Sequence, residues 1–169
     1  MLLSKGFLSR NIFHYVAYNQ NEKDFSFLCW CLSETEIADL ITERDESGYT
    51  CLHCSSDYPE NTPVLLNYAH KFMRFEIGSF NDFVLAEDVH GNTFLHNLEE
   101  NFDSDSGKNF FSALRDELSN EVYNRLLRVR NKEGQTILQV EKKIQEEIVK
   151  CCAKVLEKDL FEELLQMTY

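Results

Sequence analysis

The stretch Glu87–His96 reads "EDVHGNTFLH", in which an acidic residue is followed in order by glycine, threonine, leucine and histidine. The same order stands upstream in "RDESGYTCLH", Arg44–His53, and downstream in "RNKEGQTILQ", Arg130–Gln139, where glutamine replaces the histidine. The spacing between successive copies is 43 residues in both cases. Three agreements at one period, with no gap, indicate a repeated structural unit.

The order of these residues predicts a turn that opens a helix. The short acidic or amide side chains that start each copy (Asp45, Asp88, Asn131) can bond to nearby backbone N–H groups, and the glycine three positions later accepts a positive φ. Threonine then suits the N-cap of a helix, with leucine and histidine on its first turn. A fainter copy opens the chain at Phe13 and His14, 39 residues before the next histidine, with serine in place of glycine.

We therefore predict an all-α fold, a helical repeat solenoid in one domain with units of about 43 residues. Between the turns, apolar residues recur at the three-to-four spacing of helices, as in "TPVLLNYAHKFMRF", residues 62–75. A long amphipathic helix or helix pair is expected over 144–167, and a mobile polar loop over 101–109. The predicted units are residues 1–44, 45–87, 88–130 and 131–169.

The composition is that of a folded, acidic protein. Of the 169 residues, 43% are hydrophobic and only two are proline, which favours long helices. The formal net charge of −12 repels nucleic acid and anionic lipid, so we expect neither nucleic-acid nor membrane binding. Without a secretory signal or a long apolar run, the six cysteines are expected to be reduced thiols of an intracellular, cytoplasmic monomer.

The pattern Asp-x-x-Gly-x-Thr-x-Leu-His resembles the ankyrin repeat, most closely at Asp45–His53 and Asp88–His96 and in part in the third copy. The resemblance implies stacked antiparallel helix pairs whose turn tips and first helices bind a protein partner. This chain departs from the family at the usual proline before leucine, where it has Cys51, Phe94 and Ile137. Its period exceeds the family's by about ten residues, which lengthen the second helix or add a third helical segment.

Long, acidic ankyrin-like units on a short chain also resemble those of short bacterial effectors and small viral ankyrin proteins. That resemblance implies a non-catalytic interaction module that acts on host proteins in the host cytosol. Two alternatives stay open: a Cys/His-dependent enzyme built on a repeat scaffold, and an interaction fragment of a larger effector.

The run "CLHC", Cys51–Cys54, raises the question of a zinc site or a thiol nucleophile. A structural role is favoured, because His53 holds the histidine position of the repeat and His96 holds the same position with no cysteine nearby. A thiol hydrolase would pair Cys151 or a cysteine of this run with a histidine such as His70, but no nucleophile signature is present. We therefore expect no catalysis, no metal and no cofactor.

Two further features have structural interpretations. Trp30 is expected in the core. The basic cluster Arg125, Arg128, Arg130 and Lys132 is expected to pair with carboxylates of the neighbouring unit rather than to bind phosphate.

The predicted partner-binding surface follows each turn to the end of the first helix. Its anchors are Tyr18, Tyr49 and Tyr58, because tyrosine offers a large contact area at low rotamer cost. We expect Tyr49 and Tyr58 to form an aromatic pair rimmed by Glu46 and Asp57, suited to a protein partner with a basic or mixed apolar and basic face. The full set is Arg10, Tyr18, Asn19, Glu46, Ser47, Tyr49, Asp57, Tyr58, Val89, His90, Asn92, Glu100, Asn101, Lys132, Glu133 and Gln135.

Overall fold

The computed structural model describes residues 5–19, 22–73, 77–98, 104–139 and 158–166. Within these residues the chain is all-α, with nine α-helices, three short 3₁₀ helices and no strand. The predicted all-α class is therefore confirmed. No helix in this part of the chain is long and apolar enough to cross a membrane.

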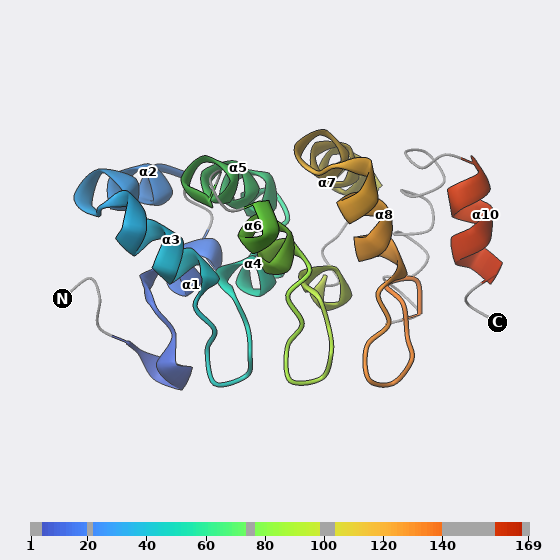
Figure 1. Ribbon diagram of the computed structural model, residues 1–169, viewed down its shortest axis with the longest axis horizontal. Coiled ribbons are helices and arrows are strands. Elements are labelled where there is room, and N and C mark those ends of the chain that lie inside the picture. The colour runs from blue at the N-terminus through green and yellow to red at the C-terminus, as the bar shows by residue number, and fades with distance from the viewer. Residues whose placement is uncertain (1–4, 20–21, 74–76, 99–103, 140–157, 167–169) are drawn as a thin grey trace.

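The helices follow one order after each of the first three loops: a short first helix, a longer second helix and a third helix. The third helix ends shortly before the next loop in each case. Figure 1 shows the sets side by side, with the loops along one edge and α2, α5 and α7 along the opposite edge. In chain order the elements are α1 (Ile12–Ala17), α2 (Glu22–Cys31), α3 (Glu34–Thr42), α4 (Cys51–Cys54), α5 (Asn61–Met73), α6 (Ile77–Val84), η3 (Phe94–Asn97), α7 (Ser104–Glu117), α8 (Asn120–Arg128) and α10 (Lys158–Gln166).

Two expectations for local structure are wrong. The segment expected as a polar loop over 101–109 is helical from Ser104. Trp30, expected in the core, is 83% exposed, because Phe25 and Leu28 occupy the buried side of α2. Of the helix expected over 144–167, residues 158–166 form α10, and the remainder lies outside the described residues.

A single side-chain oxygen, from aspartate or asparagine, shapes each turn as the sequence predicts. Asp45 Oδ1 accepts the N–H groups of Ser47 at 2.8 Å and Tyr49 at 2.9 Å. Gly48 then takes a φ of +78°, which a residue with a β-carbon rarely adopts. The same bonds and a similar φ recur in the next two loops, at Asp88 with Gly91 and at Asn131 with Gly134.

The fainter amino-terminal copy makes comparable bonds with different residues. Ser9 stands in place of the glycine and has a φ of +59°. Gly6 donates its N–H to the carbonyl of Arg10 at 2.8 Å, as Asp45 does to the carbonyl four residues on in its own loop. Asn11 replaces threonine as the N-cap of α1, and its Oδ1 accepts the N–H of Phe13 at 2.9 Å.

We call the loops at residues 5–11, 43–50, 86–93 and 129–136 fingers. Each finger bonds to the next through its backbone: the N–H groups of Glu46, Val89 and Lys132 reach the preceding finger at 3.0, 3.1 and 3.0 Å. A β-carbon at Gly91 would lie 2.9 Å from the backbone nitrogen of Lys132. The close approach of successive fingers therefore adds a second reason for glycine at that position.

Buried histidines join the units to one another. His53 Nδ1 accepts the backbone N–H of Thr50 at 3.2 Å, so the ring proton is on Nε2, which donates to the carbonyl of Asn92 in the next finger at 3.1 Å. His96 repeats this arrangement with Thr93 and Gln135, and His14 repeats it with Asn11 and Tyr49. We call these bonds the histidine bridges.

Within the described residues, the last copy shows one of the two bonds of a histidine bridge. Gln139 occupies the histidine position, and its Oε1 accepts the N–H of Thr136 at 2.9 Å. This amide oxygen takes the place of Nδ1, but unlike imidazole it does not titrate. Glutamine can thus replace histidine as the acceptor of this backbone N–H, without the sensitivity to pH.

Two substitutions at His53 test the two hydrogen bonds of its bridge separately. We expect His53→Ala to lower the free energy of unfolding by about 1–3 kcal/mol, because the Thr50 N–H and the Asn92 carbonyl lose a buried partner. We expect His53→Gln to cost less, because glutamine restores the bond to Thr50 as Gln139 does in its own unit. Urea denaturation measures both values, and an unchanged stability of His53→Ala would show that the bridge does not hold the units together.

The same residue makes stability depend on pH. Burial lowers the pKa of His53 from 6.5 to about 4, and burial also lowers the pKa of His14 and His96. Below pH 6.5 the unfolded chain binds a proton at this histidine, whereas the folded protein does so only near pH 4. The free energy of unfolding is therefore undiminished above pH 6.5 and decreases by about 3 kcal/mol in all as the pH falls from 6.5 toward 4. We expect His53→Gln to flatten the unfolding free energy over this interval, measured by urea titration at successive pH values. Parallel curves for the two proteins would contradict the assignment.

Candidate protein-binding surface

The predicted partner-binding residues divide between the finger tips and the finger bases. The exposed residues at the tips are Glu46, Val89, His90, Lys132 and Glu133. Ser47 is half-buried between fingers, where its carbonyl accepts the N–H of Val89. Glu100 and Asn101 lie outside the described residues.

Several predicted side chains are engaged within the chain. Asn131 Nδ2 donates to Asn92 Oδ1 at 2.9 Å and lies 3.3 Å from Gln135 Oε1. Asn19 Nδ2 donates to the carbonyl of Tyr15 at 2.6 Å, which closes the end of α1. Asn92 and Gln135 therefore contribute to the finger architecture and Asn19 to the end of α1, and a partner would have to compete for their polar atoms.

Four other predicted residues meet in one cavity of about 320 Å³ at the finger bases. Arg10 and Tyr18 come from the first unit, and Tyr49 and Asp57 come from the second. Three residues that the sequence analysis did not assign to the surface complete the lining: His53, Cys54 and Asn97. Residues from three successive units thus form one concave feature.

The charge in this cavity is fixed by a partly covered ion pair. Arg10 Nε donates to Asp45 Oδ2 at 2.9 Å, and the Asp45 side chain has no exposed surface while that of Arg10 is 23% exposed. Although burial opposes it, the hydrogen bond to Asp45 raises the pKa of Arg10. Burial raises the pKa of Tyr49, so its hydroxyl remains a hydrogen-bond donor at neutral pH.

The expected pairing of Tyr49 with Tyr58 is wrong. Tyr58 packs edge-to-face against Tyr18, with ring centroids 5.8 Å apart, and Tyr49 stacks on His53 at 5.3 Å. The reason is that the histidine bridge places His53 directly beside the Tyr49 ring. The aromatic pair of this surface is therefore Tyr18 with Tyr58, contributed by two different units.

Asn97 adds a polar group that the sequence analysis missed. Its Nδ2 atom is buried, and no acceptor in the described part of the chain bonds to it. The signal was available, because Asn97 directly follows the bridging His96 and corresponds to Cys54 one period earlier. In the cavity this amide can donate to an oxygen of a bound molecule.

The cysteines and histidines of this region do not assemble a metal or nucleophile site. Among the described residues no three of His, Cys, Asp and Glu are arranged to hold a metal ion. Cys51 Sγ bonds to the carbonyl of Ile41, and burial raises the pKa of Cys54 to about 12. A thiolate is thus disfavoured at neutral pH, whereas thiol catalysis requires one. Cys151, named in the alternative enzyme hypothesis, lies outside the described residues.

Comparison with known proteins adds no family to this description. No protein-family model matches the chain, and no curated protein sequence matches it. We therefore infer a function from the geometry.

Thiol labelling tests the burial of this region. In the folded protein at neutral pH, we expect iodoacetamide to modify the exposed Cys31 while Cys51 and Cys54 stay unmodified. Urea should make all three reactive, as peptide mass spectrometry would show. Rapid labelling of Cys54 before unfolding would instead reveal an accessible thiol of low pKa and would revive the enzyme hypothesis.

Proposed function

We propose that the chain is an ankyrin-like helical repeat solenoid that binds a protein partner on the face formed by its fingers and first helices, and that it catalyses no reaction. The recurring finger bonds and the histidine bridges support the solenoid assignment. Stacked repeats bury their apolar faces against their neighbours and leave one extended surface for binding.

The observation that carries this proposal is the cavity shared by three units. Tyr18 and Tyr58 supply an aromatic pair beside it, while Arg10, Asp57 and Asn97 supply charge and hydrogen-bonding groups. Aromatic rings and arginine in a concave setting have the composition of protein-interface hot spots. A partner side chain that enters the cavity would contact all three units at once.

The charge distribution decides which kind of partner suits this surface. The chain has a formal net charge of −12, with Glu46 exposed at a finger tip and Asp57 in the cavity lining. We infer a partner that presents an apolar or aromatic anchor flanked by Lys or Arg. The negative field of the chain would then accelerate the encounter, in a manner that salt weakens.

The test begins with the tagged full chain, used to capture proteins from a eukaryotic lysate. Retained proteins are identified by mass spectrometry, and the purified candidate is titrated by calorimetry against the parent and its variants. Binding that is independent of the variants below would be attributed to another surface.

We expect the double change Tyr18→Ala and Tyr58→Ala to weaken partner binding by about 2 kcal/mol or more, roughly 30-fold in Kd. Trp30→Ala is the matched control, since it removes an exposed aromatic from α2, outside the candidate surface. Higher salt should slow association more than it speeds dissociation. The proposal is refuted if the folded double variant binds as tightly as the parent.

A further inference from the structure

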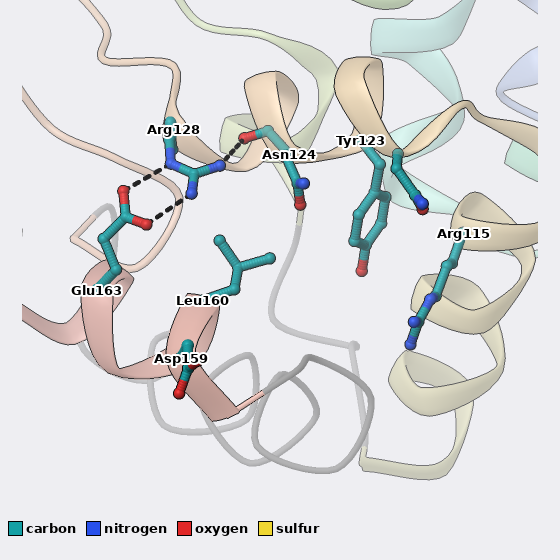
Figure 2. Close-up of a pocket in the computed structure, with 8 residues that line it drawn as sticks. Arg115, Tyr123, Asn124, Arg128, Asp159, Leu160 and Glu163 are labelled. Carbon is teal, nitrogen blue, oxygen red and sulfur yellow. Dashed lines mark hydrogen bonds and ion pairs between the residues drawn. The ribbon is translucent and has the colours of Figure 1, made fainter.

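A groove separates α8 from α10, the last helix in the structure. It encloses about 320 Å³ and is lined by Arg115 of α7, by Tyr123 and Arg128 of α8, and by Asp159, Leu160 and Glu163 of α10. Figure 2 shows the Leu160 side chain pointing from α10 toward Asn124 on α8. This groove is separate from the candidate protein-binding surface and shares no residue with it.

An ion pair with two hydrogen bonds spans the groove. Arg128 Nε and Nη2 donate to the two carboxylate oxygens of Glu163 at 2.7 and 2.6 Å. The third nitrogen, Nη1, donates to the carbonyl of Asn124 at 3.0 Å, which fixes the plane of the guanidinium (Figure 2). This fork-to-fork geometry recognises a carboxylate by shape as well as by charge.

The basic side of the groove is unusual in so acidic a chain. Arg128 lies in the last turn of α8 and Arg115 in the last turn of α7, and both line the groove. The expectation that the cluster pairs with carboxylates is confirmed for Arg128, whereas Arg130 and Lys132 bond to the backbone carbonyls of Gly134 and Val89. On the α8 side, Asn120, Tyr123 and Asn124 complete the lining, so the groove combines positive charge with hydrogen-bonding groups around one aromatic ring.

The features that α10 presents to the groove form a short pattern. Asp159, Leu160 and Glu163 place an acid, a leucine and a second acid on one side of the helix. On the solvent side, Lys158 and Glu162 pair with each other at 3.7 Å, with side chains 84% and 56% exposed. The helix that lies against the groove is thus amphipathic, and the side that contacts the groove carries two acidic residues and a leucine.

The hold on α10 is weak enough for exchange. The Arg128 and Glu163 side chains are 34% and 49% exposed, so salt weakens this ion pair, although its two parallel hydrogen bonds make it stronger than an isolated surface pair. Leu160 and Phe161 are only half-buried. A helix of this length is also marginal on its own in water, so α10 depends on these contacts.

We propose that the α8 side of this groove is a docking site for an acidic amphipathic helix of a partner protein, which α10 occupies in cis until the partner displaces it. A tethered helix competes at an effective concentration in the millimolar range, so a partner helix binds the intact chain more weakly than it binds a chain whose α10 is loosened. The partner at this groove is therefore acidic, in contrast to the partner inferred for the finger surface.

A stapled peptide provides the probe. It carries the α10 sequence KDLFEELLQ, a fluorescein label and a lactam between the residues equivalent to Lys158 and Glu162, which lie on the solvent side. Fluorescence anisotropy reports its binding to the full chain. We expect Glu163→Gln in the protein to tighten probe binding about tenfold, because it releases the helix bound in cis. Glu162→Gln, the same chemical change on the solvent side, should leave probe affinity unchanged.

Two further arms test the groove itself. In the Glu163→Gln background, Arg128→Gln should abolish probe binding while circular dichroism stays helical, and Arg128→Glu should restore binding to a probe carrying arginine at the position of Glu163. Raising salt should weaken the probe complex of the Glu163→Gln protein. Equal probe affinity in the parent, Glu163→Gln and Glu162→Gln proteins, or no binding in any of them, would overturn the proposal and make α10 a fixed structural element.

Discussion

A neutral imidazole between two backbone groups links each of the first three units to its successor. At His53, for example, one ring nitrogen accepts the N–H that opens its own helix and the other donates to the carbonyl at the base of the next finger. Both partners are backbone atoms, so the link makes no demand on the side chains of the finger tips. The tips can therefore vary in sequence while the spacing of the units is preserved, which separates recognition from folding.

The residues at the finger bases both stack the units and line the cavity. Asp45 turns the finger with one carboxylate oxygen and holds the Arg10 guanidinium with the other. The Tyr49 carbonyl receives the bond from His14, while the Tyr49 ring lies against His53 and lines the shared cavity. The side chains that line the cavity are consequently positioned by the same bonds that stack the units, and a change that loosens a bridge would also disturb the candidate protein-binding surface.

The sequence predicted the features that depend on nearby residues. The turn at Asp45, the positive φ of Gly48 and the position of His53 all follow from short-range bonds, and the period alone located them. Contacts between units were harder to predict, because the Tyr18–Tyr58 pair depends on how the first unit stacks on the second. Exposure of Trp30 depends on which side of α2 faces its neighbours, which the mixed apolar sequence of that helix does not reveal.

The two ends of the chain differ in what they offer to a neighbour. Every histidine bridge runs in one direction, from an imidazole N–H to a carbonyl about one unit further along the chain. Because the ribosome delivers the amino-terminal unit first, each donor is synthesised before the acceptor that it will bind. The imidazole N–H of a unit that has already been synthesised is thus available when the next finger leaves the ribosome. Among the described residues, the three bridges therefore all point from an earlier unit to a later one.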